Sequence, residues 1–192
     1  MIKYKTMEKF KNYADEIANQ NGFIISKYNE DQSVDVIGDL CLDSDNLSEM
    51  PIKFNKVTGH FYCERNNITS YQLKYCPRYV DGDFICYANY LTSLKNGPKY
   101  VGGIFDCSNN SLTSLEGCHE FIGGTFDCSN NNLTSLKGCP RHIEGDFVCS
   151  NNMLKSLKHA PEIIRGKWII DDEYKSYPEY QKYLLVKKIE AL

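Results

Sequence analysis

The chain has 192 residues, of which 42% are hydrophobic, and a formal net charge of −3. This length and composition allow one continuous domain with a buried core. The mild negative charge argues against nonspecific nucleic-acid binding, which needs a basic face. No apolar run is long enough to span a membrane, and residues 1–10 are charged and lack the apolar core of a secretion signal. We therefore expect a cytoplasmic protein.

The first 37 residues are predicted to form a cap at one end of the protein. Residues 6–20 carry apolar side chains at helical spacing, which predicts a helix. These side chains are Met7, Phe10, Tyr13, Ala14 and Ile17. The pair Asn21-Gly22 is typical of a helix end. Residues 23–25 and 34–37 are candidate strands that lead into the next region, so we assign residues 1–37 to a cap of helix and strand.

A sequence repeat begins at residue 38. It is marked by seven glycines at steps of 21, 23, 21, 21, 21 and 21 residues: Gly38, Gly59, Gly82, Gly103, Gly124, Gly145 and Gly166. Two residues after each glycine comes a large apolar side chain: Leu40, Phe61, Phe84, Phe105, Phe126, Phe147 and Trp168. Seven residues after the first six glycines come Asp45, Asn66, Asn89, Asn110, Asn131 and Asn152. A period in this range predicts a solenoid, an architecture that usually serves as a binding surface.

The repeat at residues 124–144 shows how each repeat is expected to fold. Phe126-Asp127-Cys128 alternates apolar and polar side chains, which predicts a short strand. Phe126 and Cys128 would face inward, while Thr125, Asp127 and Ser129 would face outward. Strands of successive repeats would then pair side by side in a parallel sheet.

The asparagine in each repeat is predicted to close a buried turn. An amide both donates and accepts hydrogen bonds, so Asn131 can satisfy backbone groups that a buried turn leaves without partners. One such residue per repeat predicts a ladder of stacked asparagines. The predicted fold is an α/β solenoid: a right-handed, parallel, leucine-rich-repeat-like β-solenoid with helical caps at both ends. It would contain six repeats over residues 38–166 and seven strands that start near Leu40, Phe61, Phe84, Phe105, Phe126, Phe147 and Trp168.

The segment Phe126-x-Cys128-x-x-Asn131-x-Leu133 resembles the leucine-rich repeat L-x-L-x-x-N-x-L, with Phe and Cys in place of the first two Leu. The preceding Leu of the family pattern corresponds to Ile122, four residues before the Phe instead of three. The continuation through residues 133–140 resembles the short repeats of bacterial effector proteins. The Cys-, Gly- and Asn-rich sequence of the repeats is also similar to that of uncharacterised repeat proteins of tailed bacteriophages. The resemblance spans residues 38 to about 170. It implies a curved solenoid that binds protein, and it implies no reaction.

Residues 167–192 are predicted to close the far end. Trp168-Ile169-Ile170 is expected to be the seventh strand, and Tyr177-Pro178-Glu179 to open a helix, because Pro is tolerated at the first helical position. Four side chains of this helix are expected to cover the last strand: Tyr180, Tyr183, Leu184 and Ile189.

The nine cysteines follow the repeat. Five share one position with Leu42 and Ile170, and three share another with Gly97 and Ala160, so both positions require a small, mostly apolar side chain. No C-x-x-C pair suggests zinc, and disulfides are not expected without an oxidising compartment. We therefore predict reduced thiols that pack in the core. Cys41 is the exception, since it takes an outward position and is the expected reactive thiol.

No catalytic group is recognised. His60, His119, His142 and His159 fall at different positions of the repeat and do not converge. Asp106 and Asp127 would be neighbours on adjacent strands, but two surface carboxylates are usually only solvated. We expect no catalytic site, no cofactor and no metal.

The outward strand positions would line a concave face that is mostly acidic, with His60 and Lys167 as its two basic side chains. Tyrosine beside carboxylates is a favourable composition for binding protein. The predicted protein-binding residues are Tyr62, Glu64, Asp83, Ile85, Tyr87, Asp106 and Asp127. The alternative site is an edge formed by Tyr75, Tyr79 and Tyr90.

These observations favour a non-catalytic protein-binding module whose partner carries a basic, partly apolar patch. The phage resemblance implies a phage-encoded binder or inhibitor of a host protein. The alternative is a nucleic-acid mimic that blocks a basic cleft, while an enzyme would need a catalytic group that the sequence does not reveal. A purely structural role is a further alternative. Neither direct nucleic-acid binding nor a membrane partner is expected, and the sequence leaves the partner and the oligomeric state open.

Overall fold

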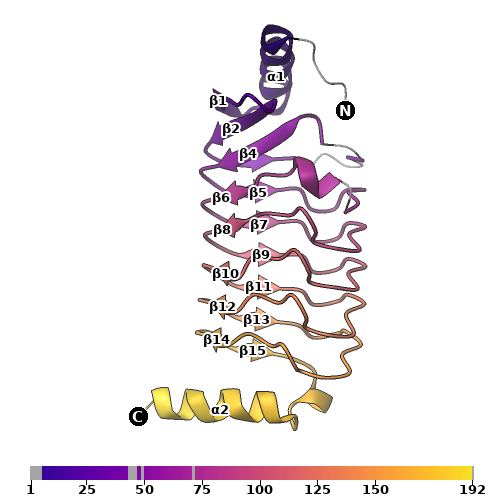
Figure 1. Cartoon of the computed structure of the whole chain (residues 1–192), viewed down its shortest axis with the longest axis vertical. Coiled ribbons are helices and arrows are strands. Elements are labelled where there is room, and N and C mark those ends of the chain that lie inside the picture. Colours follow the sequence, from indigo (N-terminus) through magenta and orange to yellow (C-terminus); the bar gives the residue numbers. More distant parts are fainter. Residues whose placement is uncertain (1–5, 43–46, 49, 71, 192) are drawn as a thin grey trace.

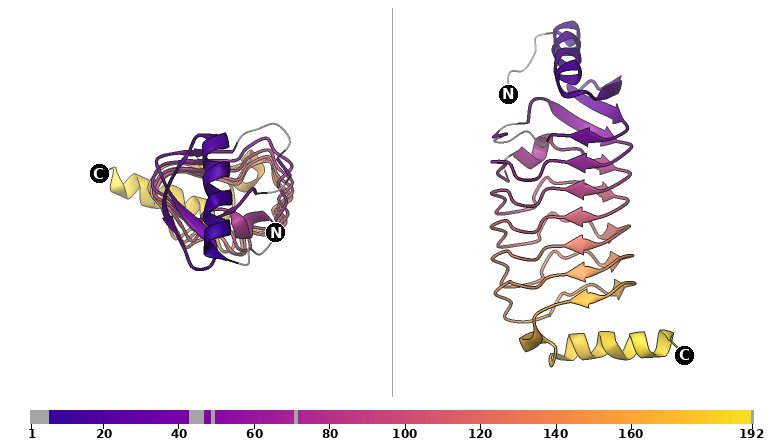
Figure 2. Two further views of the ribbon diagram at one scale, coloured as in Figure 1. Left: turned by 90° about the horizontal axis from the view of Figure 1, so that it is seen from above. Right: turned by 180° about the vertical axis from the view of Figure 1, so that it is seen from behind.

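The computed structural model describes residues 6–42, 47, 48, 50–70 and 72–191. The chain winds into a column of stacked coils with one helix at each end (Figure 1). The parallel β-solenoid of about six turns with helical caps, predicted from the repeat, is confirmed. Figures 1 and 2 show a nearly straight column, so its faces are flat along the stacking axis rather than concave.

Helix α1 (Met7–Asn21) covers the first end of the column, as predicted. The side chain of Thr6 caps the helix by accepting a hydrogen bond from the backbone N–H of Lys9. The helix ends at Gly22, whose φ of 72° is left-handed and favours glycine. The inner face of α1 buries Phe10, Ala14 and Ala18.

Each coil contributes one strand to each of two sheets. Sheet B has seven parallel strands at the predicted positions: β3 (Leu40–Cys41), β5 (Phe61–Tyr62), β7 (Phe84–Ile85), β9 (Phe105–Asp106), β11 (Phe126–Asp127), β13 (Phe147–Val148) and β15 (Trp168–Ile169). Sheet A was not predicted as a sheet. Its strands are β1 (Ile24–Tyr28), β2 (Ser33–Ile37), β4 (Lys53–Val57), β6 (Tyr79–Val80), β8 (Tyr100–Val101), β10 (Phe121–Ile122), β12 (His142–Ile143) and β14 (Ile163–Ile164).

Sheet A begins with an antiparallel pair, β1 and β2, and is parallel from β2 onward. The two-residue strands from β6 to β12 are possible because each of them pairs with the coil above and the coil below, and β14, the last strand in the order, pairs with β12. Val101, Ile122 and Ile143 reach the core from these strands, as the repeat predicted for these positions. The sequence therefore placed the side chains correctly but missed that their backbone forms a second sheet.

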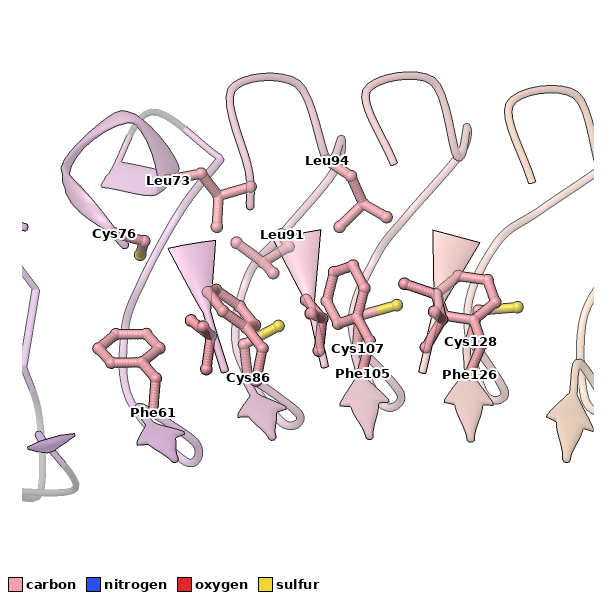
Figure 3. Close-up of a cluster of buried hydrophobic side chains, with 14 of the residues drawn as sticks. Phe61, Leu73, Cys76, Cys86, Leu91, Leu94, Phe105, Cys107, Phe126 and Cys128 are labelled. Atoms are coloured by element: carbon pink, nitrogen blue, oxygen red, sulfur yellow. The ribbon is translucent and has the colours of Figure 1, made fainter. Parts of the chain in front are cut away.

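The core is a stack of aromatic rings and sulfur atoms between the sheets and the turns. Each strand of sheet B from β5 onward buries one aromatic side chain, and successive ring centroids lie 5.0 to 6.0 Å apart. Figure 3 shows Phe105 and Phe126 side by side, with the sulfur atoms of Cys107 and Cys128 beside them. Gly145 makes the close stacking possible, because a Cβ atom there would lie 2.5 Å from the backbone N of Thr125 in the previous coil.

The predicted asparagine ladder is present. Nδ2 of Asn131 donates to the carbonyl oxygens of Cys107, Cys128 and Ser129, each at 3.1 Å, and Oδ1 accepts from the backbone N–H of Leu112 at 2.9 Å. Asn131 thus joins its own turn to the previous coil. The same bonds recur at Asn66, Asn89, Asn110 and Asn152. Asp45, the first member of this column, lies outside the described residues.

Helix α2 (Pro178–Glu190) covers the last coil, with Pro178 in its first turn as predicted. Two short 3₁₀ helices, η1 (Gln72–Tyr75) and η2 (Asp172–Tyr174), lie in the turns. Tyr180 and Tyr183 pack on Trp168, as predicted, with ring centroids 5.4 and 5.7 Å from its ring. Leu184 and Ile189 are exposed instead of covering the last strand, so that part of the prediction was wrong. No described helix combines the length and apolar character needed to cross a membrane.

Candidate functional site

The outward side of sheet B is the predicted binding surface, and we call it the sheet B face. Its central row runs in register along the column: Cys41, Tyr62, Ile85, Asp106, Asp127, Val148 and Ile169. A second row precedes each strand, from Asp39 to Lys167, and a third follows each strand. Asp43, the first member of the third row, lies outside the described residues.

The carboxylates of the row before the strands hold successive coils together. Oδ1 of Asp83 accepts a hydrogen bond from the backbone N–H of Ile104 at 2.6 Å. Asp39 and Asp146 bind the N–H groups of His60 and Lys167 in the same way, at 2.8 and 2.7 Å. These aspartates therefore have a structural role that the sequence did not reveal, because each already uses an oxygen within the fold.

Asp106 and Asp127 lie side by side in the central row, as predicted, but they also stabilise the turn after their strands. Oδ1 of Asp127 accepts from the backbone N–H of Ser129 at 2.9 Å and from its hydroxyl at 2.6 Å, while Asp106 accepts from the N–H of Ser108. Both serines are buried, although an outward position was predicted for Ser129. Burial, and to a smaller extent the charge of Asp106, raises the pKa of Asp127. Lysine at these positions would therefore disrupt the turn as well as change the charge of the surface.

The remaining predicted residues form what we call the tyrosine patch: Tyr62, Glu64, Asp83, Ile85 and Tyr87. Tyr62 and Ile85 are paired neighbours on β5 and β7, and Glu64 and Tyr87 take equivalent positions just after these two strands. All five residues are half-buried. The structure thus brings five of the seven predicted residues together near the first coils.

The surroundings of Tyr62 are acidic. Burial raises its pKa, and the negative charges of Asp83, Asp39 and Glu64 add to the effect. Its ring stacks on that of His60, with centroids 5.8 Å apart and planes at 27°. Oε2 of Glu64 is buried and has no hydrogen-bond partner among the described residues. Arg65, which was not predicted, holds its guanidinium 5.5 Å from the ring centre of Tyr87 and adds one positive charge beside the patch.

The outward side of sheet A carries a second surface, which sequence reasoning missed. Its strands place Tyr79, Tyr100, Phe121, His142 and Ile163 next to one another along the column, and we call this series the sheet A row. The rings of Phe121 and His142 meet edge to face, with centroids 5.2 Å apart. Tyr79 and Tyr100 are exposed. A repeated aromatic position one residue before a buried Val or Ile was the signal in the sequence.

The alternative edge of Tyr75, Tyr79 and Tyr90 is distributed over different elements. Tyr75 belongs to η1 beside Lys74, Tyr79 belongs to β6, and Tyr90 forms an isolated backbone bridge with Thr69. Strand pairing joins Tyr79 to Tyr100 rather than to the other two.

The cysteines are thiols, and most of them are core side chains. All nine lie in the described part of the chain, and none forms a disulfide. Burial raises the pKa of Cys118 and Cys149 to about 12, and it raises the pKa of Cys63, Cys86, Cys107, Cys128 and Cys139 as well. These thiols stay protonated at neutral pH and are poor nucleophiles. Cys41 is exposed, as predicted.

No group of three or more His, Cys, Asp or Glu side chains in the described ranges is arranged to hold a metal ion. Comparisons with protein-family models, with curated proteins and with solved structures find no match. The tyrosine patch and the sheet A row are therefore judged on their own geometry.

Proposed function

We propose that the protein is a non-catalytic protein-binding module and that the tyrosine patch contacts the partner. The partner would present a basic, partly apolar surface. Tyr62, Ile85 and Tyr87 supply the apolar area, and Glu64 with the acidic surroundings of Tyr62 supplies the charge. Tyrosines contribute a large contact area at a low cost in side-chain entropy, and they are enriched among residues that dominate binding energy.

One observation carries this proposal: among the described outward positions of sheet B, tyrosine occurs at Tyr62 and Tyr87, and both belong to the patch. Farther along the central row, Asp106 and Asp127 bind the next turns. In contrast, the aromatic and aliphatic side chains of the patch stand partly exposed on the outward side of a rigid stack. A repeat protein needs no tyrosine at these outward positions in order to stack.

The experiment compares capture of native-host proteins by three baits. They are the natural chain, a patch variant with Tyr62→Ala and Tyr87→Ala, and a matched variant with Tyr79→Ala and Tyr100→Ala. A partner of the patch should be captured by the first and third baits and lost with the second. With the purified partner, each alanine in the patch should weaken binding by about 2 kcal/mol, or about thirtyfold, if it replaces an anchor.

Charge is tested separately with Glu64→Gln, which removes a carboxylate without changing the size of the side chain. Association should become slower and less dependent on salt, because charge complementarity acts mainly on the encounter of the partners. If the matched sheet A variant loses the partner and the patch variant keeps it, the proposal is wrong and the sheet A row is the binding surface. A captured protein that releases nucleic acid in competition with the chain would favour the nucleic-acid mimic.

The proposals about the origin of the protein and its place of action rest on the sequence of the repeat. Its resemblance to leucine-rich repeats of bacterial effector proteins supports protein binding, and its resemblance to tailed-bacteriophage repeat proteins supports a phage-encoded binder or inhibitor of a host protein. We propose action in the host cytoplasm on the same grounds. The distribution of carboxylates gives less support to nucleic-acid mimicry, because Asp39, Asp83 and Asp146 accept backbone hydrogen bonds within the column.

A further inference from the structure

The two sheets end differently at the last coil. In a parallel sheet, successive residues turn their N–H and C=O groups alternately to the strand before and to the strand after. The last strands, β14 in sheet A and β15 in sheet B, therefore turn one set of these groups toward α2 instead of toward a further coil. In sheet A this set belongs to Ile164, and in sheet B it belongs to Trp168.

The edge of sheet B is closed by side chains of α2. The backbone N–H of Trp168 donates to the hydroxyl of Tyr183 at 3.0 Å, and the hydroxyl of Tyr180 donates to the carbonyl of Trp168 at 3.5 Å. The hydroxyl of Tyr183 also donates to the carbonyl of Gly166 at 3.0 Å. Along β15 the helix thus takes the place of a further strand, which protects this edge from pairing with another chain.

The edge of sheet A is open. The N–H of Arg165 donates to the carbonyl of Ile143 in β12, so Ile164 turns its own N–H and C=O away from β12. No backbone or side-chain group within the described ranges binds either of these two groups. Ile164 is nevertheless buried, with 7% of its surface exposed. Buried backbone groups are rarely left without a partner, so this pair marks a place for a ligand.

A cleft lies beside these two groups. It has a volume of about 400 Å³ between α2 and the last coil, and Ile163, Ile164 and Arg165 line it on the side of β14. One stripe of α2 lines the other side, at spacings of three and four residues: Glu179, Lys182, Tyr183, Val186, Lys187 and Glu190. Figure 1 shows α2 running below β14 and past it. From Glu179 to Glu190 the helix rises about 16 Å, which matches the length of about five residues of extended chain.

The lining of the cleft selects the kind of ligand. Its charged side chains balance, with three basic and three acidic ones: Arg165, Lys182, Lys187, Glu162, Glu179 and Glu190. The cleft therefore favours neither an anion such as a phosphate nor a cation. Leu157, Trp168 and Val186 add an apolar lining that suits aliphatic groups. The N–H and C=O of Ile164 require an acceptor and a donor at the spacing of a strand. An extended, uncharged peptide with aliphatic side chains has all of these properties.

We propose that the cleft binds an extended, uncharged, aliphatic segment of a partner protein, which pairs with β14 as a further strand of sheet A. Backbone groups of the segment would bind the N–H and C=O of Ile164, and an aliphatic side chain would enter the cleft beside Val186. In strand addition of this kind, backbone bonds supply affinity and the pockets for side chains supply specificity. The tyrosine patch lies near the first coils, so this proposal does not depend on what the patch binds.

The test uses the full chain and the blocked peptide acetyl-Thr-Val-Ile-Val-Thr-amide. Trp168 lines the cleft and is the one tryptophan of the sequence, so its fluorescence reports occupancy. The peptide should change this fluorescence in a saturable manner and should slow the deuterium exchange of the Ile164 N–H, measured by NMR. The same peptide with N-methyl groups on its three central residues cannot donate hydrogen bonds there. It should bind at least about tenfold more weakly, because backbone hydrogen bonds are lost.

Two neighbouring substitutions in α2 test the position of the site. Val186→Arg places a charge in the cleft and should raise the dissociation constant of the peptide by about tenfold or more. Leu185→Arg is the matched control and should leave binding unchanged, because Leu185 is exposed and does not belong to the described lining of the cleft.

Three results would overturn the proposal: no saturable response to the peptide, equal binding of the N-methylated peptide, or unchanged binding by Val186→Arg. Sedimentation distinguishes a further occupant. A natural chain that sediments at twice 22.1 kDa, and returns to 22.1 kDa when the peptide is added, would show that a second copy fills the cleft, and the assignment to a partner protein would be wrong.

Discussion

The inward and outward sides of sheet B differ in how closely the repeat controls them. Inward, each strand from β5 to β13 presents a Phe, and each turn after it presents the same asparagine with the same bonds. Outward, the central row changes from Tyr62 to Ile85, then to Asp106 and Asp127. Coils can stack only if the interior matches from one to the next, whereas the outward positions are free to vary. Variation on a regular scaffold is therefore where a binding surface should be sought.

Some outward positions of sheet B are not free to vary, because their side chains also hold the fold together. Asp83 and Asp127 look like surface charges in the sequence, yet both accept backbone hydrogen bonds. Tyr62 and Ile85 make a more informative contrast with the interior, because they vary and stand partly exposed.

Cysteine reactivity gives the largest expected difference between the two sides. Cys41 points outward from β3, whereas Cys107 and Cys128 take inward positions in later coils. A thiol reagent at neutral pH should label one thiol quickly in the folded protein and all nine after unfolding, with rates that differ by several orders of magnitude, because the buried thiols are protonated and inaccessible. Cys41→Ser should abolish the fast phase. Fewer than nine reactive thiols in unfolded protein without reductant, or bound zinc in a metal analysis, would contradict the packing role of the cysteines.

The asparagine ladder gives the next largest effect. Asn131→Ala removes the partner of three carbonyl oxygens and of the Leu112 N–H in a buried turn. We expect a loss of about 3 kcal/mol in the free energy of unfolding, since buried groups without partners cost about 1–3 kcal/mol each. Thermal and denaturant unfolding measure it. The neighbouring Asn132→Ala is the control, because that side chain is exposed and its removal should change little.

Substitution of the residue before a ladder asparagine should have a smaller effect on stability, and of opposite sign. Three of these positions hold Asn109, Asn130 and Asn151, and all have φ between 52° and 55°. Ala88 occupies the same position with φ of 52°, a conformation that costs alanine about 1 kcal/mol or more. Ala88→Asn should therefore stabilise the protein by about 0.5–1 kcal/mol, which corresponds to a rise of about 1–4 °C in Tm. The reverse change, Asn109→Ala, should lower Tm, and a lower Tm for Ala88→Asn would show that Ala88 has a packing role.

The sequence predicted whatever the repeat enforces, and it missed what depends on neighbouring coils. The Phe126 and Asn131 columns predicted the strands of sheet B and the ladder because both recur at one spacing. Sheet A escaped prediction because a strand such as His142–Ile143 buries one side chain and lacks the alternation of apolar and polar side chains that marks Phe126-Asp127-Cys128. The sheet A row was missed for the same reason.

Two other differences between the prediction and the structure, at Ile189 and at Asp127, have causes within a short stretch of sequence. Nine residues separate Tyr180 from Ile189, which at about 100° per residue puts them on opposite sides of a helix, so Ile189 cannot cover the last strand when Tyr180 does. The role of Asp127 reflects a short-range pattern, in which an aspartate accepts from the residue two places on. Both could have been read from the sequence, whereas the coil-to-coil bond from Asp83 to Ile104 required the register of the stack.

Substitution of Asp127 should have the smallest effect on stability. It tests whether the carboxylate of Asp127 is buried like the interior or solvated like the surface. Its pKa is raised in the folded state, mainly by burial, so the folded protein holds the proton more tightly than the unfolded chain. The ionised carboxylate therefore lowers stability at neutral pH, and this loss disappears as the pH falls through the folded pKa toward the unfolded value of 3.8. Asn at this position can still accept from Ser129 and carries no charge. Asp127→Asn should raise Tm slightly at pH 7, and the gain should vanish in acid. Asp172 is the control of opposite sign, because Lys175 lowers its pKa at the surface and Asp172→Asn should slightly lower Tm at pH 7. If Asp127→Asn lowers Tm at pH 7 as well, the carboxylate is better solvated than its burial indicates, and the central row is open to a partner as far as β11.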